Sequence, residues 1–373
     1  MTTTTTIQAP FRYDVVGSLL RPASLKQAHA QLAAGEITRD QELAIQQTEI
    51  KRIVAEQVKL GLKAVTDGEF SRSWWHLDFL WGLTGVGKYD YHKSYKFKGD
   101  HTRTDNAELT GKIAYNPDHP FFAAFKYLQS LVPDGVLAKQ TIPSPTMLFR
   151  DNRSDNWNKF YDRWEDYLND LAQAYHETIQ HFYDLGCRYI QLDDTTWAFL
   201  ISKLNDDQTD HAQYTKMAAD AVTVINAALN GLPKDLTVTT HICRGNFKST
   251  YLFSGSYDVV APYLGQLNYD GLFLEYDNQR AGGFEILDQI WNHDDHKRIV
   301  LGLVTSKFPE LENPADIQAR IQAASKKVPL ANLALSTQCG FASTEEGNQL
   351  SEAQQWAKLK LVIDTAKTVW PEA

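Results

Sequence analysis

The stretch DLGCRYIQLDDT, residues 184–195, decides how the chain folds. Gly186 separates a helical pattern from a short apolar run that ends in two acids, and KLGLKAV at 59–65 repeats this arrangement. Glycine commonly ends a helix because it adopts the left-handed backbone conformation without steric cost. Both runs hardly alternate between apolar and polar residues, which is typical of parallel strands covered on both faces. The sequence therefore predicts a helix–glycine–strand unit that is used more than once.

Eight such strands alternate with helical segments along the chain. Their expected ranges are 14–20, 63–69, 136–142, 188–195, 236–243, 271–277, 298–306 and 333–341. Two helices stand out: one ends at Gly61 and begins at a capping box of Thr38 and Gln41, and the other covers 157–185. Eight strand–helix units predict an α/β fold of the (β/α)8 TIM-barrel type. A doubly wound sheet is the alternative, but the G-x-G-x-x-G of its first turn is missing.

The chain is expected to form a single barrel domain over residues 1–373. No internal repeat, proline-rich linker or other composition boundary divides it. One segment breaks the rhythm: residues 74–100, which follow the second strand, are long and rich in aromatic residues. This insertion is interpreted as a loop over the barrel mouth or as a contact between subunits, and the sequence leaves both readings open.

Composition narrows the class of protein. A formal charge of −9 without a compensating cluster of lysine and arginine argues against a nucleic-acid partner. No apolar run approaches the roughly 18 residues that cross a bilayer, and the N-terminus lacks the pattern of a signal peptide. Three widely spaced cysteines are a poor disulfide framework. These features predict a cytoplasmic protein with reduced thiols and no membrane partner, and they leave a homo-oligomer open.

Polar and metal-binding residue types follow nearly every predicted strand. In a barrel of this kind the loops after the carboxyl ends of the strands meet at one mouth, so residues at these ends are expected to share a site. The residues at or just beyond the strand ends are Ser18, Glu69, Asp193, Asp194, His241, Cys243, Glu275, Lys307 and Cys339.

Four of these residues form a candidate zinc site: His241, Cys243, Glu275 and Cys339. Two thiolates, an imidazole and a carboxylate suit zinc better than magnesium or calcium. The wide spacing excludes a zinc finger but fits ligands donated by three strand ends. Since a lone cysteine in a strand is usually a small buried hydrophobic residue, Cys187, at the start of its strand, is expected in the core.

The motifs VVGSLLRP, VTDGEFSR, IQLDD, THICRGN, FLEYD and STQCGF together resemble the catalytic domain of the cobalamin-independent methionine synthase family. The resemblance covers nearly the whole chain, so the sequence resembles a short, single-barrel relative. It implies a methyltransferase that moves a methyl group to the thiol of homocysteine, forming methionine. It also implies that His241, Cys243, Glu275 and Cys339 hold the zinc. Glu69, Asp193, Gly17 and Ser18 would then bind the amino-acid end of homocysteine.

The resemblance is weaker for the residues that in the family act on the methyl donor. Lys307 stands where the family has a catalytic histidine, and it takes the place of the group that supplies a proton. Phe199 replaces an acid that contacts folate in the family, and no tryptophan near 144–152 matches the one that stacks on folate. The sequence therefore leaves the methyl donor open between methyl-folate and another compound.

Two rival functions use the same residues. One is an alkyl or methyl transferase with another thiol acceptor or a corrinoid donor, although two carboxylates, Glu69 and Asp193, favour an acceptor that carries an ammonium group. The other is a non-catalytic zinc protein. Structural zinc sites are usually closed, cysteine-rich and local in sequence, which disfavours that reading.

Overall fold

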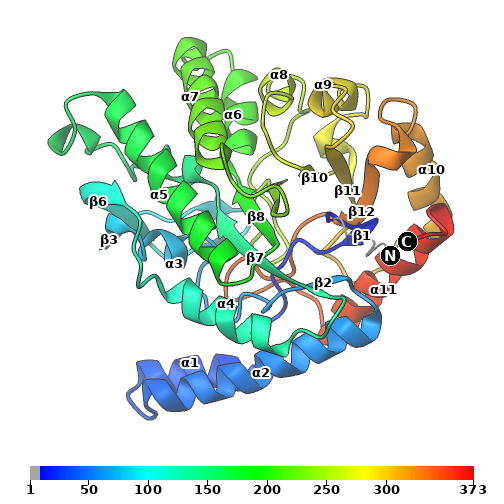
Figure 1. The fold of residues 1–373 in the computed structure, drawn as a ribbon, viewed down its shortest axis with the longest axis horizontal. Helices are drawn as coiled ribbons and strands as arrows, with labels where there is room; N and C mark the ends of the chain where they lie inside the picture. Colours follow the sequence, from blue (N-terminus) through cyan, green and yellow to red (C-terminus); the bar gives the residue numbers. More distant parts are fainter. Residues whose placement is uncertain (1–8) are drawn as a thin grey trace, which may run out of the picture.

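The computed structural model describes residues 9–373 and contains an eight-stranded parallel barrel (Figure 1). The barrel strands are β1 (Tyr13–Asp14), β2 (Ala64–Val65), β7 (Leu137–Pro143), β8 (Tyr189–Asp194), β9 (Thr237–Ile242), β10 (Gly271–Glu275), β11 (Arg298–Val304) and β12 (Leu333–Thr337). Their order is β1-β12-β11-β10-β9-β8-β7-β2. Each strand lies within or one residue beyond a predicted range, so the (β/α)8 fold class is confirmed.

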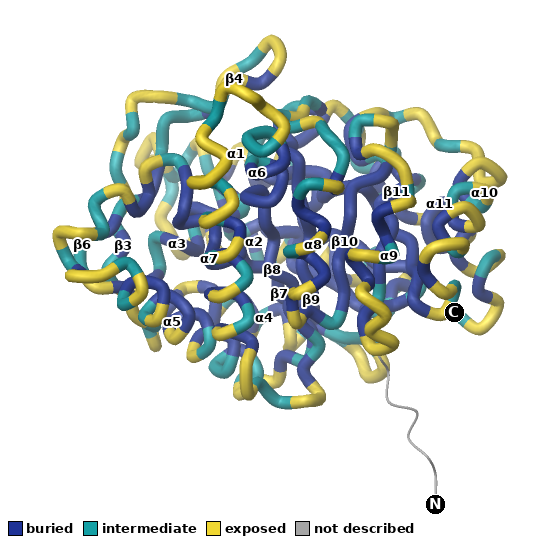
Figure 2. The backbone as a smooth tube through the Cα atoms, turned by 90° about the horizontal axis from the view of Figure 1, so that it is seen from above, coloured by how far each residue is buried: buried dark blue, intermediate teal, exposed yellow. Residues whose placement is uncertain are grey.

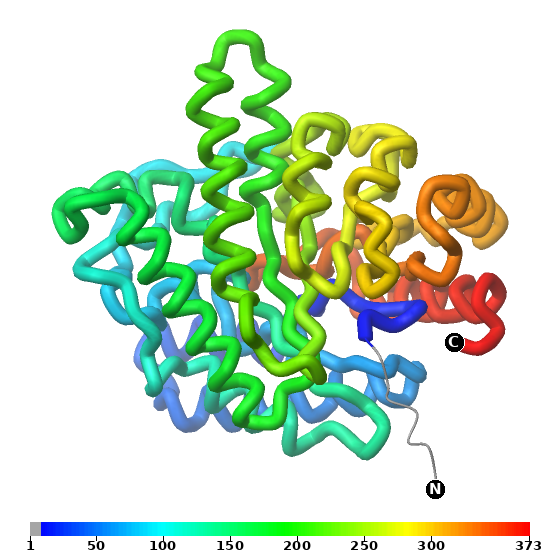
Figure 3. The backbone as a smooth tube through the Cα atoms, turned by 45° about the horizontal axis from the view of Figure 1, so that its top comes forward, coloured from blue at the N-terminus to red at the C-terminus, as the bar shows by residue number. Residues whose placement is uncertain are grey.

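Helices surround the barrel (Figure 1). They are α1 (Ala23–Ala33), α2 (Arg39–Leu60), α4 (Pro120–Leu131), α5 (Trp164–Asp184), α6 (Thr196–Leu204), α7 (His211–Leu229), α8 (Ala261–Leu264), α9 (Leu287–Trp291), α10 (Pro314–Ala324) and α11 (Glu352–Val369). The green pair α6 and α7 extends beyond the other helices in Figure 3. In Figure 2 the barrel strands at the centre of the molecule are coloured mostly as buried.

Local sequence signals fix the ends of α2. Thr38 accepts a hydrogen bond from the Gln41 backbone N–H at 3.3 Å, and the Gln41 side chain accepts one from the Thr38 backbone at 2.8 Å. The helix ends at Gly61, whose φ of 95° lies in the left-handed region. Both the predicted capping box and the predicted glycine stop are confirmed.

The predicted helix over 157–185 is wrong at its start. Residues Trp157–Lys159 form a short 3₁₀ turn, and α5 begins only at Trp164, after an extended Arg163. The rings of Trp157 and Trp164 pack edge to face with centroids 5.5 Å apart. The aromatic spacing that suggested one long helix therefore belongs to a turn that folds back onto the first residue of α5.

The first and second strands are much shorter than predicted, since only two residues of each pair with a neighbour. β1 and β2 do not pair as strands, and individual hydrogen bonds join the segments that follow them. The Leu19 N–H donates to the Gly68 carbonyl at 3.0 Å, and the Thr66 hydroxyl donates to the Gly17 carbonyl at 2.6 Å. Because the chain leaves the ladder early, residues 16–18 and 66–69 are free to shape the barrel mouth.

The segment 74–100 is more structured than the predicted loop. It contains α3 (Leu77–Leu80), β3 (Thr84–Asp90) and β4 (Lys96–Phe97). β3 pairs with β6 (Asp105–Ala114), and β4 pairs with β5 (Asp100–His101) in a hairpin that rises at the top of Figure 2. The expectation that residues 1–373 form one domain with this insertion stays a prediction, since residues 1–8 lie outside the described part.

No helix within residues 9–373 is long and apolar enough to cross a membrane. The absence of a signal peptide also rests on the first eight residues, which lie outside the described part of the chain.

Candidate functional site

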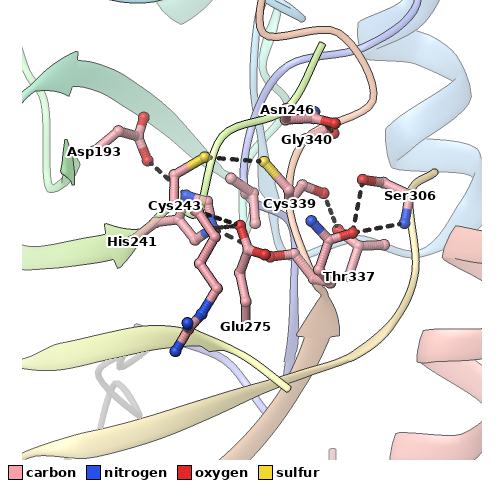
Figure 4. A network of polar contacts seen from close by, with 12 residues as sticks. Asp193, His241, Cys243, Asn246, Glu275, Ser306, Thr337, Cys339 and Gly340 are labelled. Atoms are coloured by element: carbon pink, nitrogen blue, oxygen red, sulfur yellow. Dashed lines mark hydrogen bonds and ion pairs between the residues drawn. The ribbon is translucent and has the colours of Figure 1, made fainter. Parts of the chain in front are cut away.

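His241, Cys243 and Cys339 come together at the carboxyl ends of the strands (Figure 4). His241 lies on β9, Cys243 follows this strand directly, and Cys339 lies two residues beyond β12. One ligand atom from each lies within 4.8 Å of the other two, and all three residues are buried. No other group of three or more such residues occurs within residues 9–373.

The spacing of the two sulfur atoms fits a tetrahedral metal. Two sulfur ligands, each about 2.3 Å from a zinc ion, lie about 3.8 Å apart in a tetrahedral site. The Sγ atoms of Cys243 and Cys339 are 3.7 Å apart, and no disulfide joins them. The donor set and its geometry are therefore suited to zinc.

Asp193 on β8 orients the imidazole of His241. Its Oδ1 lies 3.4 Å from Nδ1 of His241, and Nε2 faces the Gln338 carbonyl at 3.1 Å. Both ring nitrogens therefore face oxygen acceptors, and to bind a metal Nε2 would have to give up its proton and its contact with the Gln338 carbonyl while Nδ1 still donates to Asp193. Burial alone favours the neutral imidazole, but Asp193, together with the charges of Cys339 and Glu275, raises the pKa of His241 to about 9.

The pKa values of the two thiols shift in opposite directions. Burial raises the pKa of Cys339, but the hydrogen bond from Cys243 and the charge of His241 outweigh it and lower that pKa below its ordinary value. The same hydrogen bond and burial raise the pKa of Cys243. Because Cys339 ionises first, it is the better prepared of the two to receive a cation.

Glu275, the fourth predicted ligand, lies at the end of β10 beside the three-residue group but outside it. Its Oε1 is 4.0 Å from Nε2 of His241 and accepts the Arg244 backbone N–H at 2.9 Å. Its Oε2 pairs with Arg280 at 2.6 Å. Burial raises the pKa of Glu275, but Lys307, Arg280 and His241 outweigh it, so the net shift is downward and the carboxylate is ionised.

Lys307 lies near this group, but it does not line either of the two cavities at the barrel mouth that are described below. Its side chain is buried, and its ammonium donates to Oδ1 of Asn246 at 2.9 Å. Oδ1 of Asn246 also accepts a hydrogen bond from the side-chain amide of Asn348, and Nδ2 of Asn246 donates to the Gly340 carbonyl at 2.8 Å. The role of Lys307 as a proton donor stays a prediction.

A polar cavity, here called the acceptor cavity, opens on one side of the cysteines. It brings together six of the predicted site residues: Ser18, Glu69, Asp193, His241, Cys243 and Cys339. Glu69 is held by the Thr141 hydroxyl at 2.8 Å and by Arg72 at 3.2 Å, both on Oε1. Within the described residues its buried Oε2 has no hydrogen-bond partner. A buried carboxylate oxygen without a partner is costly, so this cavity is prepared for a group that donates hydrogen bonds.

Val16 and Ser18 line one side of this cavity, and Gly17 lies between them in the chain. Gly17 has a φ of 144°, and a Cβ atom there would lie 2.7 Å from Cγ2 of Thr141, so a side chain does not fit. The Ser18 hydroxyl accepts the Ala342 N–H at 3.3 Å. These contacts bring β1 close to β7 and to the loop after β12 around the mouth.

A second cavity, here called the aromatic chamber, opens on the other side of Cys243. Its aromatic walls are Trp74, Trp75, Tyr95, Phe97, Phe247 and Phe253. Tyr95 and Phe97 come from the β4–β5 hairpin, whose Phe97 ring lies 5.3 Å from that of Phe247. Of the two interpretations of segment 74–100, this placement supports a cover over the mouth.

The sequence did not single out several of these residues. Arg72, Thr141 and Arg280 hold the carboxylates of the site, and Asn246 holds Lys307. Asn246 belongs to the quoted THICRGN motif, so its position next to the ligands was a usable signal. Arg72 lies three residues after Glu69 in the quoted VTDGEFSR motif and Arg280 lies five residues after Glu275, so both spacings were usable signals. Thr141 carried no such signal, because it lies on β7, 72 residues from Glu69.

The model of the family "Cobalamin-independent synthase, Catalytic domain" matches residues 127–368 of the chain. The chain belongs to the cobalamin-independent methionine synthase family. The Bacillus subtilis protein YxjH, itself uncharacterized, is 48% identical over 97% of this chain and 96% of its own length. A Listeria monocytogenes protein, provisionally named a vitamin-B12 independent methionine synthase, is 40% identical in a crystal structure that covers 97% of this chain and 98% of that one, with a TM-score of 0.77.

A more distant relative carries an assigned activity. The 5-methyltetrahydropteroyltriglutamate–homocysteine methyltransferase of Lactiplantibacillus plantarum is 24% identical over 95% of this chain, which spans 42% of that longer protein. Fold and relatives together indicate a methyltransferase of the methionine synthase type and agree with the resemblance found in the sequence.

Proposed function

We propose that the protein transfers a methyl group to the thiol of homocysteine and forms methionine. The observation that carries this proposal is the meeting of His241, Cys243 and Cys339 beside a polar cavity that holds Glu69 and Asp193. A metal site and an ammonium site side by side fit a substrate with a thiol at one end and an amino-acid group at the other.

The metal of this proposal is zinc, held by His241, Cys243 and Cys339, with Glu275 as the fourth ligand. Bound zinc keeps a coordinated thiol deprotonated at neutral pH, which makes its sulfur a nucleophile. The Glu275 carboxylate would have to share Oε1 between the metal and the Arg244 backbone N–H. Arg280 would keep Oε2 occupied and so orient the carboxylate.

The amino-acid end of homocysteine would lie in the acceptor cavity. Its ammonium group would donate to the unpartnered oxygen of Glu69 and to Asp193. Its carboxylate would meet Ser18 and the adjacent backbone, since hydroxyl and N–H donors suit a carboxylate. Gly17 would leave the room for this approach.

Lys307 supplies a proton in this scheme only if the leaving group of the methyl donor requires one. Its ammonium would first have to leave Asn246, because it does not line either cavity. Location in the cytoplasm and assembly into a homo-oligomer stay predictions that accompany this proposal.

Cobalt substitution tests the proposal directly. Cobalt(II) at the site should show thiolate charge-transfer absorption, and homocysteine should change this band because its sulfur becomes a ligand. Homoserine, in which a hydroxyl replaces the thiol, is the matched control and should leave the band unchanged. An unchanged band at saturating homocysteine would refute direct coordination of the substrate.

A further inference from the structure

Among the described residues that line the aromatic chamber, none is an acid suited to release a proton near neutral pH. Apart from Cys243, the titratable side chains among its described lining residues are His76, Tyr95 and Arg150. None of the lining residues is a carboxylic acid or a lysine. A general acid reaches the atom that it protonates directly or through one water, and these three are the titratable side chains, apart from Cys243, that reach the described chamber directly.

The contact with Arg153 keeps His76 from acting as a general acid. An arginine side chain can only donate, and Nη2 of Arg153 lies 3.0 Å from Nε2 of His76, so this ring nitrogen is the acceptor. The imidazole is therefore neutral, with its single proton on Nδ1. Burial and the neighbouring charges of Arg153 and Arg150 lower the pKa of His76 well below its ordinary value.

Tyr95 and Arg150 do not supply a proton either. The Tyr95 hydroxyl donates to Asp151 at 2.6 Å and accepts from Arg153 at 2.7 Å. Burial raises the pKa of Tyr95 to about 12. The guanidinium of Arg150 keeps its protons under all ordinary conditions. A methyl donor in this chamber must therefore release a leaving group that needs no proton.

The walls of the chamber favour a positive charge on the donor. Aromatic faces attract sulfonium and quaternary ammonium groups through the ring quadrupole. Six aromatic side chains line the chamber around Cys243, two of them from the β4–β5 hairpin. A sulfonium meets both conditions, because it carries the charge and departs as a neutral thioether.

The positive charge of Arg150 favours a methyl donor that also carries a negative group. Its Nε pairs with Asp151 at 2.8 Å and its Nη1 donates to the Thr195 carbonyl at 3.1 Å. Its Nη2 makes only a long contact of 3.4 Å with Asp151. The second N–H group of Nη2 is suited to a carboxylate, so a zwitterion fits the chamber better than a simple cation.

We infer that the methyl donor is a small sulfonium zwitterion, with its methylsulfonium group among the aromatic walls and its carboxylate toward Arg150. This inference rests on the proposed function, because it uses the homocysteine thiolate as the nucleophile. The thiolate sulfur attacks a methyl carbon and forms a new carbon–sulfur bond. The old carbon–sulfur bond breaks with its electron pair going to the donor sulfur, which leaves as a neutral thioether. No proton, oxidant or reductant is consumed.

Binding measurements test the charge preference without turnover. Dimethylsulfoniopropionate and 4-methylpentanoate have nearly the same shape and the same carboxylate, and they differ in the sulfonium charge. Titration calorimetry on the zinc-loaded protein should show dimethylsulfoniopropionate binding between about twofold and thirtyfold more tightly. Phe247→Leu should reduce this ratio and leave 4-methylpentanoate binding unchanged, with Phe253→Leu as a second variant. Equal binding of the two compounds to the unmodified protein would overturn the inference.

Turnover with labelled donors tests the reaction. Zinc-loaded protein with homocysteine should form trideuteromethyl-methionine from labelled dimethylsulfoniopropionate, measured by mass spectrometry. Methionine formed only from methyl-tetrahydrofolate or only from methylcobalamin would overturn the sulfonium assignment. The homocysteine response of the cobalt spectrum separates the two proposals. If the response is present while sulfonium transfer fails, only the donor assignment falls, whereas its absence refutes the proposed function.

Discussion

The acceptor cavity and the aromatic chamber share Trp75, Cys243 and Ser343, yet their chemistry is opposite. The acceptor cavity contains two carboxylates and the metal-binding group, while the chamber has aromatic walls and no carboxylate among its described residues. One side of Cys243 is therefore lined by ionisable groups that can pair directly with charges, and the other is lined mainly by aromatic rings. The shared cysteine places its sulfur where the two sides meet.

The largest effect is expected when this shared centre is removed. Cys339→Ser should lower zinc affinity by at least about a hundredfold and abolish methyl transfer, because the serine hydroxyl does not ionise as the thiol does. Elemental analysis after chelator dialysis measures the loss. Cys187→Ser is the matched control: this thiol is buried, donates to the Tyr189 carbonyl at 3.2 Å and has a pKa raised by burial to about 12. Equal zinc loss in both variants would contradict the site.

The acceptor cavity alone should respond to Glu69→Gln. Removing the charge that faces the ammonium group should weaken homocysteine binding by about ten- to a hundredfold, since hydrogen bonds to charged groups contribute about 1.5–3 kcal/mol. The readout is the KM for homocysteine. The analogue 4-mercaptobutanoate, which has no ammonium group, should bind equally well to both proteins. A parallel loss of both ligands would place Glu69 in a structural role.

A smaller effect is expected from pH. Burial raises the pKa of Glu69, Arg72 opposes this, and Asp193 adds to it, with a net upward shift. As the pH falls toward this raised pKa, Glu69 gains a proton and loses its attraction for the ammonium group. The affinity ratio of homocysteine to 4-mercaptobutanoate should therefore fall with decreasing pH, starting above the range of an ordinary glutamate. In Glu69→Gln this component of the pH dependence should disappear, and a ratio with the same pH dependence in both proteins would contradict the assignment.

The smallest effect is expected at the cover of the chamber. Lys248, after β9, pairs with Asp100 of the β4–β5 hairpin at 2.6 Å, and both side chains are partly exposed. Exposed ion pairs contribute little, so Lys248→Met should change the KM for the donor by no more than about threefold. Phe97→Ala, which removes a buried wall residue from the same hairpin, should raise it more. The reverse order would show that the ion pair, and not the aromatic wall, holds the cover.

The sequence by itself determined the eight-stranded barrel and pointed to the three residues, His241, Cys243 and Cys339, that meet as a candidate metal site. Both follow from short-range signals: strands that do not alternate between apolar and polar residues, the glycine stop at Gly61, and polar residues at nearly every strand end, which the barrel then brings to one mouth. The helix start at Trp164 escaped this reasoning because Trp157 packs onto it from a separate turn, and sequence spacing does not distinguish such a turn from a helix.

Only the tertiary structure decided how the site is divided. Arg280 occupies one oxygen of Glu275, Asn246 holds Lys307 away from both cavities, and Arg153 fixes His76 as neutral. Lys307 lies 61 residues from Asn246 and Arg153 lies 77 residues from His76, so no local pattern encodes these two contacts. The physical reason is that strand ends converge by the geometry of the barrel, whereas the protonation and pairing of each side chain depend on neighbours that meet only after folding.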